Sequence, residues 1–227
     1  MAREAERLGV HLETDAPVKT ILIERGRARG IELEDGRTIA ANVVAANVDP
    51  KLLYLKLLPR DVLPEEFRAR IERLRMGSAT LRMNVALSEL PRFTAAPQSD
   101  ASDTHLGAGI IMAPSLAYMD RAHAQARLTG YSQQPIVEML IPSTVDDSLA
   151  PAGAHVASLF CQHFAPQLPD GRSWQDERTT AVDLIIDTVT GYAPNFRASI
   201  LGTSALSPLD LEQRLALTNG DIFHGAL

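Results

Sequence analysis

From residue 79 onwards, long alternating segments are interleaved with amphipathic helical segments, and this pattern limits the fold more than any other feature. Four segments have strand character: 79–88, 106–112, 135–142 and 154–164. Residues 115–128 and 174–192 predict helices, the second with Val182, Ile185, Ile186 and Val189 on one face. We therefore expect the strands at 79–88, 135–142 and 154–164 to be neighbours in one sheet that is layered with helices. A strand near 198–206 and a short helix after Pro208 follow.

The front part of the chain has shorter elements. Residues 1–9 predict a helix, 18–24 and 28–34 predict strands, and Asp35-Gly36 is a strong signal for a hairpin into a third strand at 38–41. The run 42–47 (NVVAAN) is apolar in the middle, which predicts a short parallel strand buried on both faces. Asp49 is the expected N-cap of a helix that starts at Pro50, and a second helix is expected at 64–76. The predicted class is mixed α/β (α+β).

Composition excludes several functions. The formal net charge of -6 and the pI of about 5.5 argue against a nucleic-acid-binding surface. Cys161 is the single cysteine, so no intramolecular disulfide can form, and a reducing, cytoplasmic compartment is expected. Apolar runs are far shorter than the ~20 residues of a membrane span, although peripheral contact with a membrane stays open.

No catalytic constellation is visible from the residues alone. Gly107-Ala108-Gly109 lacks the third glycine of the dinucleotide-binding motif and fits a strand with small residues better. His155 and His163 would share one face of a strand but lie about 26 Å apart, too far for a common metal ion. No metal site is expected, and Cys161 fits a buried, inert thiol. The residues indicate a mixed α/β domain and little more.

A resemblance to a known family indicates a function, which the composition does not. Three segments resemble phytoene-dehydrogenase-like FAD-dependent oxidoreductases: residues 9–50, with Ala28-x-Gly30-Ile31 and Asp49-Pro50; Leu81 to Phe93, with Leu90-Pro91-x-Phe93; and Thr218-Asn219-Gly220-Asp221-Ile222-Phe223-His224-Gly225. The last segment is similar to the branch related to pyridine-nucleotide-disulfide oxidoreductases rather than to the carotenoid desaturases themselves.

The resemblance implies a division of the chain and a cofactor. Residues 1–50 would be part of an FAD-binding domain, 51–77 a helical connection, 78–206 the substrate-binding domain, and 207–227 a return towards the FAD-binding domain. Val18 would meet the adenine end of FAD, and Ala45, Ala46 and Asn47 would lie near the cofactor. His224 is the one residue expected near the redox centre, with a structural role at its turn as the alternative. An apolar small molecule is the implied substrate.

The glycine-rich unit that holds the pyrophosphate in such enzymes is missing from the sequence. We therefore expect a fragment that is inactive alone and does not retain FAD, whose partners are the missing FAD-binding segments. The alternative is a stand-alone binding or interaction module derived from the substrate domain. In the first case the strand at 42–47 would lack a cover, so self-association through exposed apolar surface is also expected.

Overall fold

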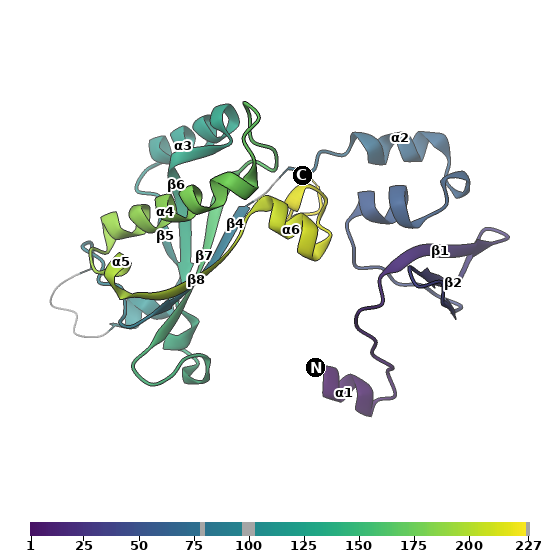
Figure 1. Cartoon of the computed structure of the whole chain (residues 1–227), viewed down its shortest axis with the longest axis horizontal. Coiled ribbons are helices and arrows are strands. Elements are labelled where there is room, and N and C mark those ends of the chain that lie inside the picture. The colour runs from purple at the N-terminus through teal and green to yellow at the C-terminus, as the bar shows by residue number, and fades with distance from the viewer. Residues whose placement is uncertain (78–79, 97–102, 226–227) are drawn as a thin grey trace. The chain divides into compact units, whose positions relative to one another are not determined.

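The computed structural model describes residues 1–77, 80–96 and 103–225. The chain forms two compact units, Met1–Leu74 and Arg75–Leu227 (Figure 1). The helices and strands confirm the predicted mixed α/β class.

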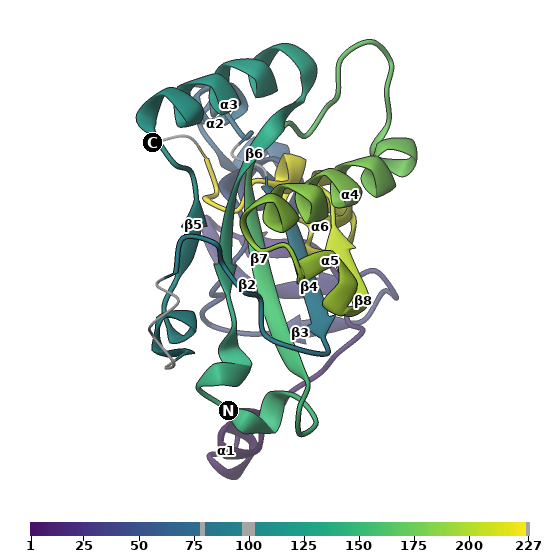
Figure 2. The same ribbon diagram turned by 90° about the vertical axis from the view of Figure 1, so that its left-hand side faces the viewer.

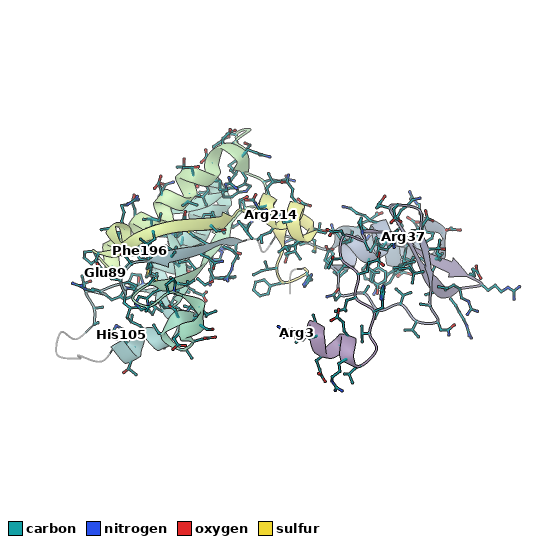
Figure 3. The ribbon with its side chains drawn as sticks, turned by 60° about the horizontal axis from the view of Figure 1, so that its bottom comes forward. Arg3, Arg37, Glu89, His105, Phe196 and Arg214 are labelled. Carbon is teal, nitrogen blue, oxygen red and sulfur yellow. The ribbon has the colours of Figure 1, made fainter. Side chains whose placement is uncertain are left out.

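The smaller unit holds a three-stranded antiparallel sheet preceded by helix α1 (Ala2–Arg7). Its strands are β1 (Val18–Glu24), β2 (Arg27–Leu33) and β3 (Thr38–Ala40), in the order β1-β2-β3. Arg25 and Gly26 both have positive φ, 50° and 73°, which is the two-residue turn that matches the twist of a hairpin. At the second turn, the Asp35 carboxylate accepts a hydrogen bond from the backbone N–H of Arg37 at 2.9 Å. The Asp35-Gly36 hairpin is thus confirmed. The Arg37 side chain, labelled in Figure 3, also pairs with Asp35.

The predicted buried strand at 42–47 is wrong. This segment has no regular structure, and among the described residues no strand pairs with it. Val43 is 80% exposed, and Ala45, Ala46 and Asn47 are exposed as well. An apolar run becomes a buried strand only when a neighbouring strand takes up its backbone hydrogen bonds, and the small sheet ends at β3.

A helical segment completes the smaller unit. The predicted cap is confirmed, because the Asp49 carboxylate accepts a hydrogen bond from Leu52 N–H at 3.0 Å at the start of a π-helical turn, Leu52–Leu57. A 3₁₀ turn at Arg60–Val62 and helix α2 (Glu65–Arg73) follow. The Thr20 hydroxyl donates to the carbonyl of Leu57 at 3.0 Å, which ties this segment to the sheet.

The larger unit is built on a five-stranded antiparallel sheet (Figure 2). Its order is β5 (Ile110–Met112), β6 (Tyr131–Leu140), β7 (His155–Phe164), β4 (Thr80–Leu87) and β8 (Ile200–Leu206). The three long segments predicted to be neighbours are therefore adjacent, as β6, β7 and β4. The segment predicted as a strand at 106–112 is shorter than expected, because a 3₁₀ turn occupies Asp103–Gly107.

The described residues of the larger unit form four α-helices, and serine side chains cap three of them. They are α3 (Leu116–Thr129), α4 (Trp174–Tyr192), α5 (Phe196–Ser199) and α6 (Pro208–Leu215), and 3₁₀ turns lie at Pro142–Thr144, Asp147–Leu149 and Thr218–Gly220. The side chains of Ser115, Ser173 and Ser207 each accept a backbone N–H at the N-terminus of the helix that follows. The short α5 is anchored by buried Phe196, labelled in Figure 3.

The core lies between one face of the large sheet and α4. Leu81, Met83, Val85 and Leu87 alternate into it from β4 and are at most 1% exposed. Val137 and Met139 of β6 and Leu159 of β7 meet them from neighbouring strands, while Ile185 and Val189 come from α4. The alternation leaves the intervening residues of these strands on the opposite face.

Candidate functional site: the second face of the large sheet

The strand register aligns one row of side chains across the second face of the sheet. Ile111 is opposite Glu138, Glu138 is opposite Phe160, and Phe160 is opposite Arg82. Leu206 of β8 is in turn opposite Arg82. Residues directly opposite one another in an antiparallel sheet share a face, so this row crosses all five strands.

Helix α3 covers only one end of this face. Ile136 of β6 packs there against Tyr118 and Ala122 of α3. The Tyr118 hydroxyl donates to the carbonyl of Pro135 at 2.9 Å, and burial raises the pKa of this phenol to about 12. Beyond α3 the face is open, as the exposure of Ile111 (64%) and Leu140 (56%) shows.

A pocket of about 520 Å³ lies on this open part of the face. Its walls include Ile111, Leu140 and Phe160 from three strands, together with Ile222 and Phe223 from the C-terminal segment. A pocket of this size, lined largely by apolar and aromatic side chains, is typical of small-molecule sites.

Arg82 supplies a positive charge to this pocket. Its guanidinium lies over the ring of Phe160, 5.2 Å from the ring centroid, and donates a hydrogen bond from Nη2 to the Ser158 hydroxyl at 3.2 Å. Within the described part of the chain it forms no ion pair. The negative charge of the pocket, Glu138, accepts a hydrogen bond from the side-chain amide of Gln162. Phe160 stands between the two charged residues in the row.

Sequence reasoning missed Arg82, although its position in β4 carried a signal. The apolar residues Leu81, Met83, Val85 and Leu87 alternate, which places Arg82 on the face opposite the core. The partners of Arg82 come from β7, and the sequence alone does not give the register between these strands.

The candidate residues chosen from the resemblance are divided between the two units. Val18 starts β1 and is half-buried, while Ala45, Ala46 and Asn47 lie in the exposed segment after β3. His224 belongs to the larger unit, where it is exposed with φ of 60° and directly follows Phe223 of the pocket wall. Their predicted contacts with a cofactor stay predictions.

The prediction that His155 and His163 share a face of one strand is wrong. The pairing of β6 with β7 is irregular between Ile136 and Tyr131, and His163 has φ of 64° at this irregularity. Residues 132–135 of β6 lie opposite His163 alone, and the left-handed conformation of His163 shifts the alternation of β7, so that Phe164 rather than His163 enters the core. His163 instead meets His123 of α3 edge-on, with ring centroids 4.9 Å apart, and burial together with the neighbouring His123 lowers the pKa of His163.

Cys161 is fully buried in β7, as predicted, and burial raises the pKa of its thiol. Protonated and enclosed, this thiol is not a nucleophile. In residues 1–77, 80–96 and 103–225 no group of three or more histidine, cysteine or acidic residues could hold a metal ion. None of the helices in these ranges is long and apolar enough to cross a membrane.

A larger hollow of about 850 Å³ lies at one end of the same unit. It is formed mainly by connecting segments, and its wall includes Glu89 and His105. Both residues are labelled in Figure 3, at the same end of the larger unit. The walls of this hollow come mainly from connecting segments, whereas those of the pocket beside Arg82 come mainly from paired strands, which hold side chains more rigidly. We therefore take the open sheet face as the candidate site.

Comparisons with known proteins agree with the resemblance. No family model matches the chain. Pyridine nucleotide-disulfide oxidoreductase domain-containing protein 2 of Mus musculus is 35% identical over 232 residues, which covers 100% of this chain and 40% of that protein. The lycopene-forming phytoene desaturase of a Paracoccus species is 25% identical over 222 residues, covering 96% of this chain and 41% of the desaturase.

Solved structures show the same fold. An oxidoreductase from Methanosarcina mazei matches 84% of this chain and 36% of its own length, with a TM-score of 0.52 and 17% identity. A protein from Pyrococcus furiosus matches the same share of the chain with a TM-score of 0.50 and 15% identity. The chain is therefore homologous to part of pyridine nucleotide-disulfide oxidoreductase domain-containing protein 2 and to part of the phytoene desaturase, and it spans about 40% of the length of these two relatives.

Proposed function

We propose that this chain supplies the substrate-binding domain of an FAD-dependent oxidoreductase and is inactive by itself. One observation carries the proposal: the large sheet is sealed by α4 on one face and holds an apolar pocket of about 520 Å³ on the other. In this role the open face binds and orients an apolar substrate and keeps water away from it. FAD would supply the redox chemistry.

The residues present do not fit a complete FAD site. A pyrophosphate is normally held at the N-terminus of a helix that follows a parallel strand and a glycine-rich turn. The sequence lacks that glycine pattern, and the strand pairs of the described residues are all antiparallel. The smaller unit, with Val18 and the segment Ala45 to Asn47, would contribute supporting contacts only.

The partner of the smaller unit would be the FAD-binding segments missing from this chain. The exposed large apolar side chains of the unit support this proposal; they include Val10, Leu12, Ile39, Val43 and Val48. Without a cover, such side chains favour self-association.

The purified chain is expected to be colourless after gel filtration in the presence of FAD. The reason is the absent pyrophosphate site, which carries most of the affinity for a dinucleotide. Absorbance near 450 nm across the protein peak measures retained flavin, and light scattering on the same column measures self-association. A stoichiometric flavin band that survives the column would contradict the proposal.

His224 is proposed to act close to the redox centre of the complete enzyme. It is exposed and follows Phe223, whose side chain lines the pocket, so its imidazole can donate a hydrogen bond or transfer a proton beside a bound substrate. His224→Ala in the full-length protein is expected to lower turnover by ~10²-fold with flavin content unchanged.

The matched control is His11→Ala, which removes an exposed imidazole from the smaller unit. It is expected to leave turnover unchanged. Should His224→Ala also leave turnover unchanged, or lower flavin content and stability together, His224 is a structural residue of its turn.

A further inference from the structure

Arg82 is a cation with few partners on a mostly apolar surface. Its guanidinium offers five N–H donors. Within the described part of the chain, one of them donates a hydrogen bond, to the Ser158 hydroxyl. The ring of Phe160 covers one side of the group. A planar guanidinium held in this way keeps its remaining donors directed at a limited region, which favours a planar, two-oxygen anion.

The other charge of the pocket does not neutralise Arg82. Among the residues that line the pocket, Arg82 and Glu138 alone are charged. Glu138 is separated from Arg82 by Phe160 in the cross-strand row, and its carboxylate is already engaged by Gln162. The Arg82 side of the pocket therefore carries a local positive charge beside the apolar side chains of Phe160, Leu140 and Phe223.

We propose that this pocket binds an apolar molecule that carries a carboxylate, with the carboxylate paired to Arg82 and the hydrocarbon part lying along the open sheet face. A pure hydrocarbon would leave the guanidinium partly desolvated without a partner, which is unfavourable for a charged group. A carboxylate would form charge-assisted hydrogen bonds that are stronger than those to a neutral oxygen. This inference rests on the proposed function, because it names the substrate class of the same site.

The test compares three ten-carbon probes, decanoate, decanol and decylammonium, by isothermal titration calorimetry on the 227-residue chain below their aggregation concentrations. Decanoate is expected to bind at least about tenfold more tightly than decanol, since hydrogen bonds between charged groups are worth more than neutral ones. Decylammonium is expected to bind no more tightly than decanol. Equal affinities for decanoate and decanol, or tighter binding of decylammonium, would overturn the proposal.

Substitutions then assign the preference to one side chain. Arg82→Gln should remove the preference for decanoate over decanol, whereas Arg82→Lys should keep part of it because the charge remains. The control Arg197→Gln removes the same charge from α5, where Arg197 pairs with Asp183 and Asp187 instead of lining the pocket. It should leave the preference unchanged. A preference that persists in Arg82→Gln would contradict the assignment.

A further variant keeps the test decisive if Arg82→Gln fails to fold. Glu138→Gln removes the negative charge of the pocket and leaves Arg82 in place, so it should maintain or increase the preference for decanoate. Loss of the preference in a folded Glu138→Gln variant would overturn the proposal. All these binding measurements use flavin-free protein, so their outcome is independent of whether the chain retains FAD on gel filtration. The carboxylate preference can therefore be absent while the proposed function holds, and it can be present while the proposed function fails.

Discussion

Gly30→Ala is expected to unfold the three-stranded sheet of the smaller unit. Gly30 lies in β2 with φ of 147°, a backbone conformation that residues with a side chain rarely adopt. A methyl group at this position would overlap the carbonyl oxygen of Ile39 and stand 3.0 Å from the Cα of Ala40. Both atoms belong to the backbone of β3, so relief requires β2 and β3 to separate. The expected cost is about 3–5 kcal/mol.

The experiment follows amide hydrogen exchange in β1, β2 and β3 together with thermal unfolding by circular dichroism. Loss of protection in the small sheet, with protection in the large sheet retained, is the expected result, because the chain forms two separate compact units. Gly36→Ala is the matched control: its φ of 86° is also positive, but no atom lies within 4 Å of the added methyl group. It should cost only about 1–2 kcal/mol. Equal effects of the two substitutions would show that the overlap with β3 is not the cause.

Where local signals and tertiary packing agree, the sequence predicted the structure closely. Helix α4 begins at Trp174 and ends at Tyr192, as predicted, because apolar residues recur at helical spacing and Ser173 caps the start. The neighbouring positions of β6, β7 and β4 also followed from segment length and alternation. The segment 42–47 failed because its apolar residues specify burial only if another strand is present to pair with it.

The candidate site was less accessible to sequence reasoning. The row from Ile111 to Leu206 depends on the register of four strand pairs, and the paired residues lie as much as 124 positions apart, as with Arg82 and Leu206. No local pattern encodes such a register. The irregularity at His163 was equally inaccessible from the sequence. There, one residue in a left-handed conformation moves the next side chain to the other face of the sheet.

Phe164→Ala is expected to destabilise the larger unit by about 3–5 kcal/mol. The shift in alternation at His163 places Phe164 in the core, where it is 1% exposed. Its ring stacks on Tyr131 with centroids 5.7 Å apart, and Trp174 lies at 6.1 Å. Removing the ring leaves a cavity between β6, β7 and the start of α4, and two aromatic side chains lose their shared neighbour.

Trp174 is the single tryptophan of the chain, so its fluorescence reports unfolding of the larger unit directly. A guanidinium titration should show a lower midpoint for Phe164→Ala with little change in slope. Phe223→Ala removes the same ring from a position that is 62% exposed and should change the free energy of unfolding by less than about 1 kcal/mol. If Phe164→Ala were as mild as this control, the side chain would not fill the core. The shift in side-chain alternation at His163 would then be contradicted, and the His163 side chain rather than that of Phe164 would point into the core.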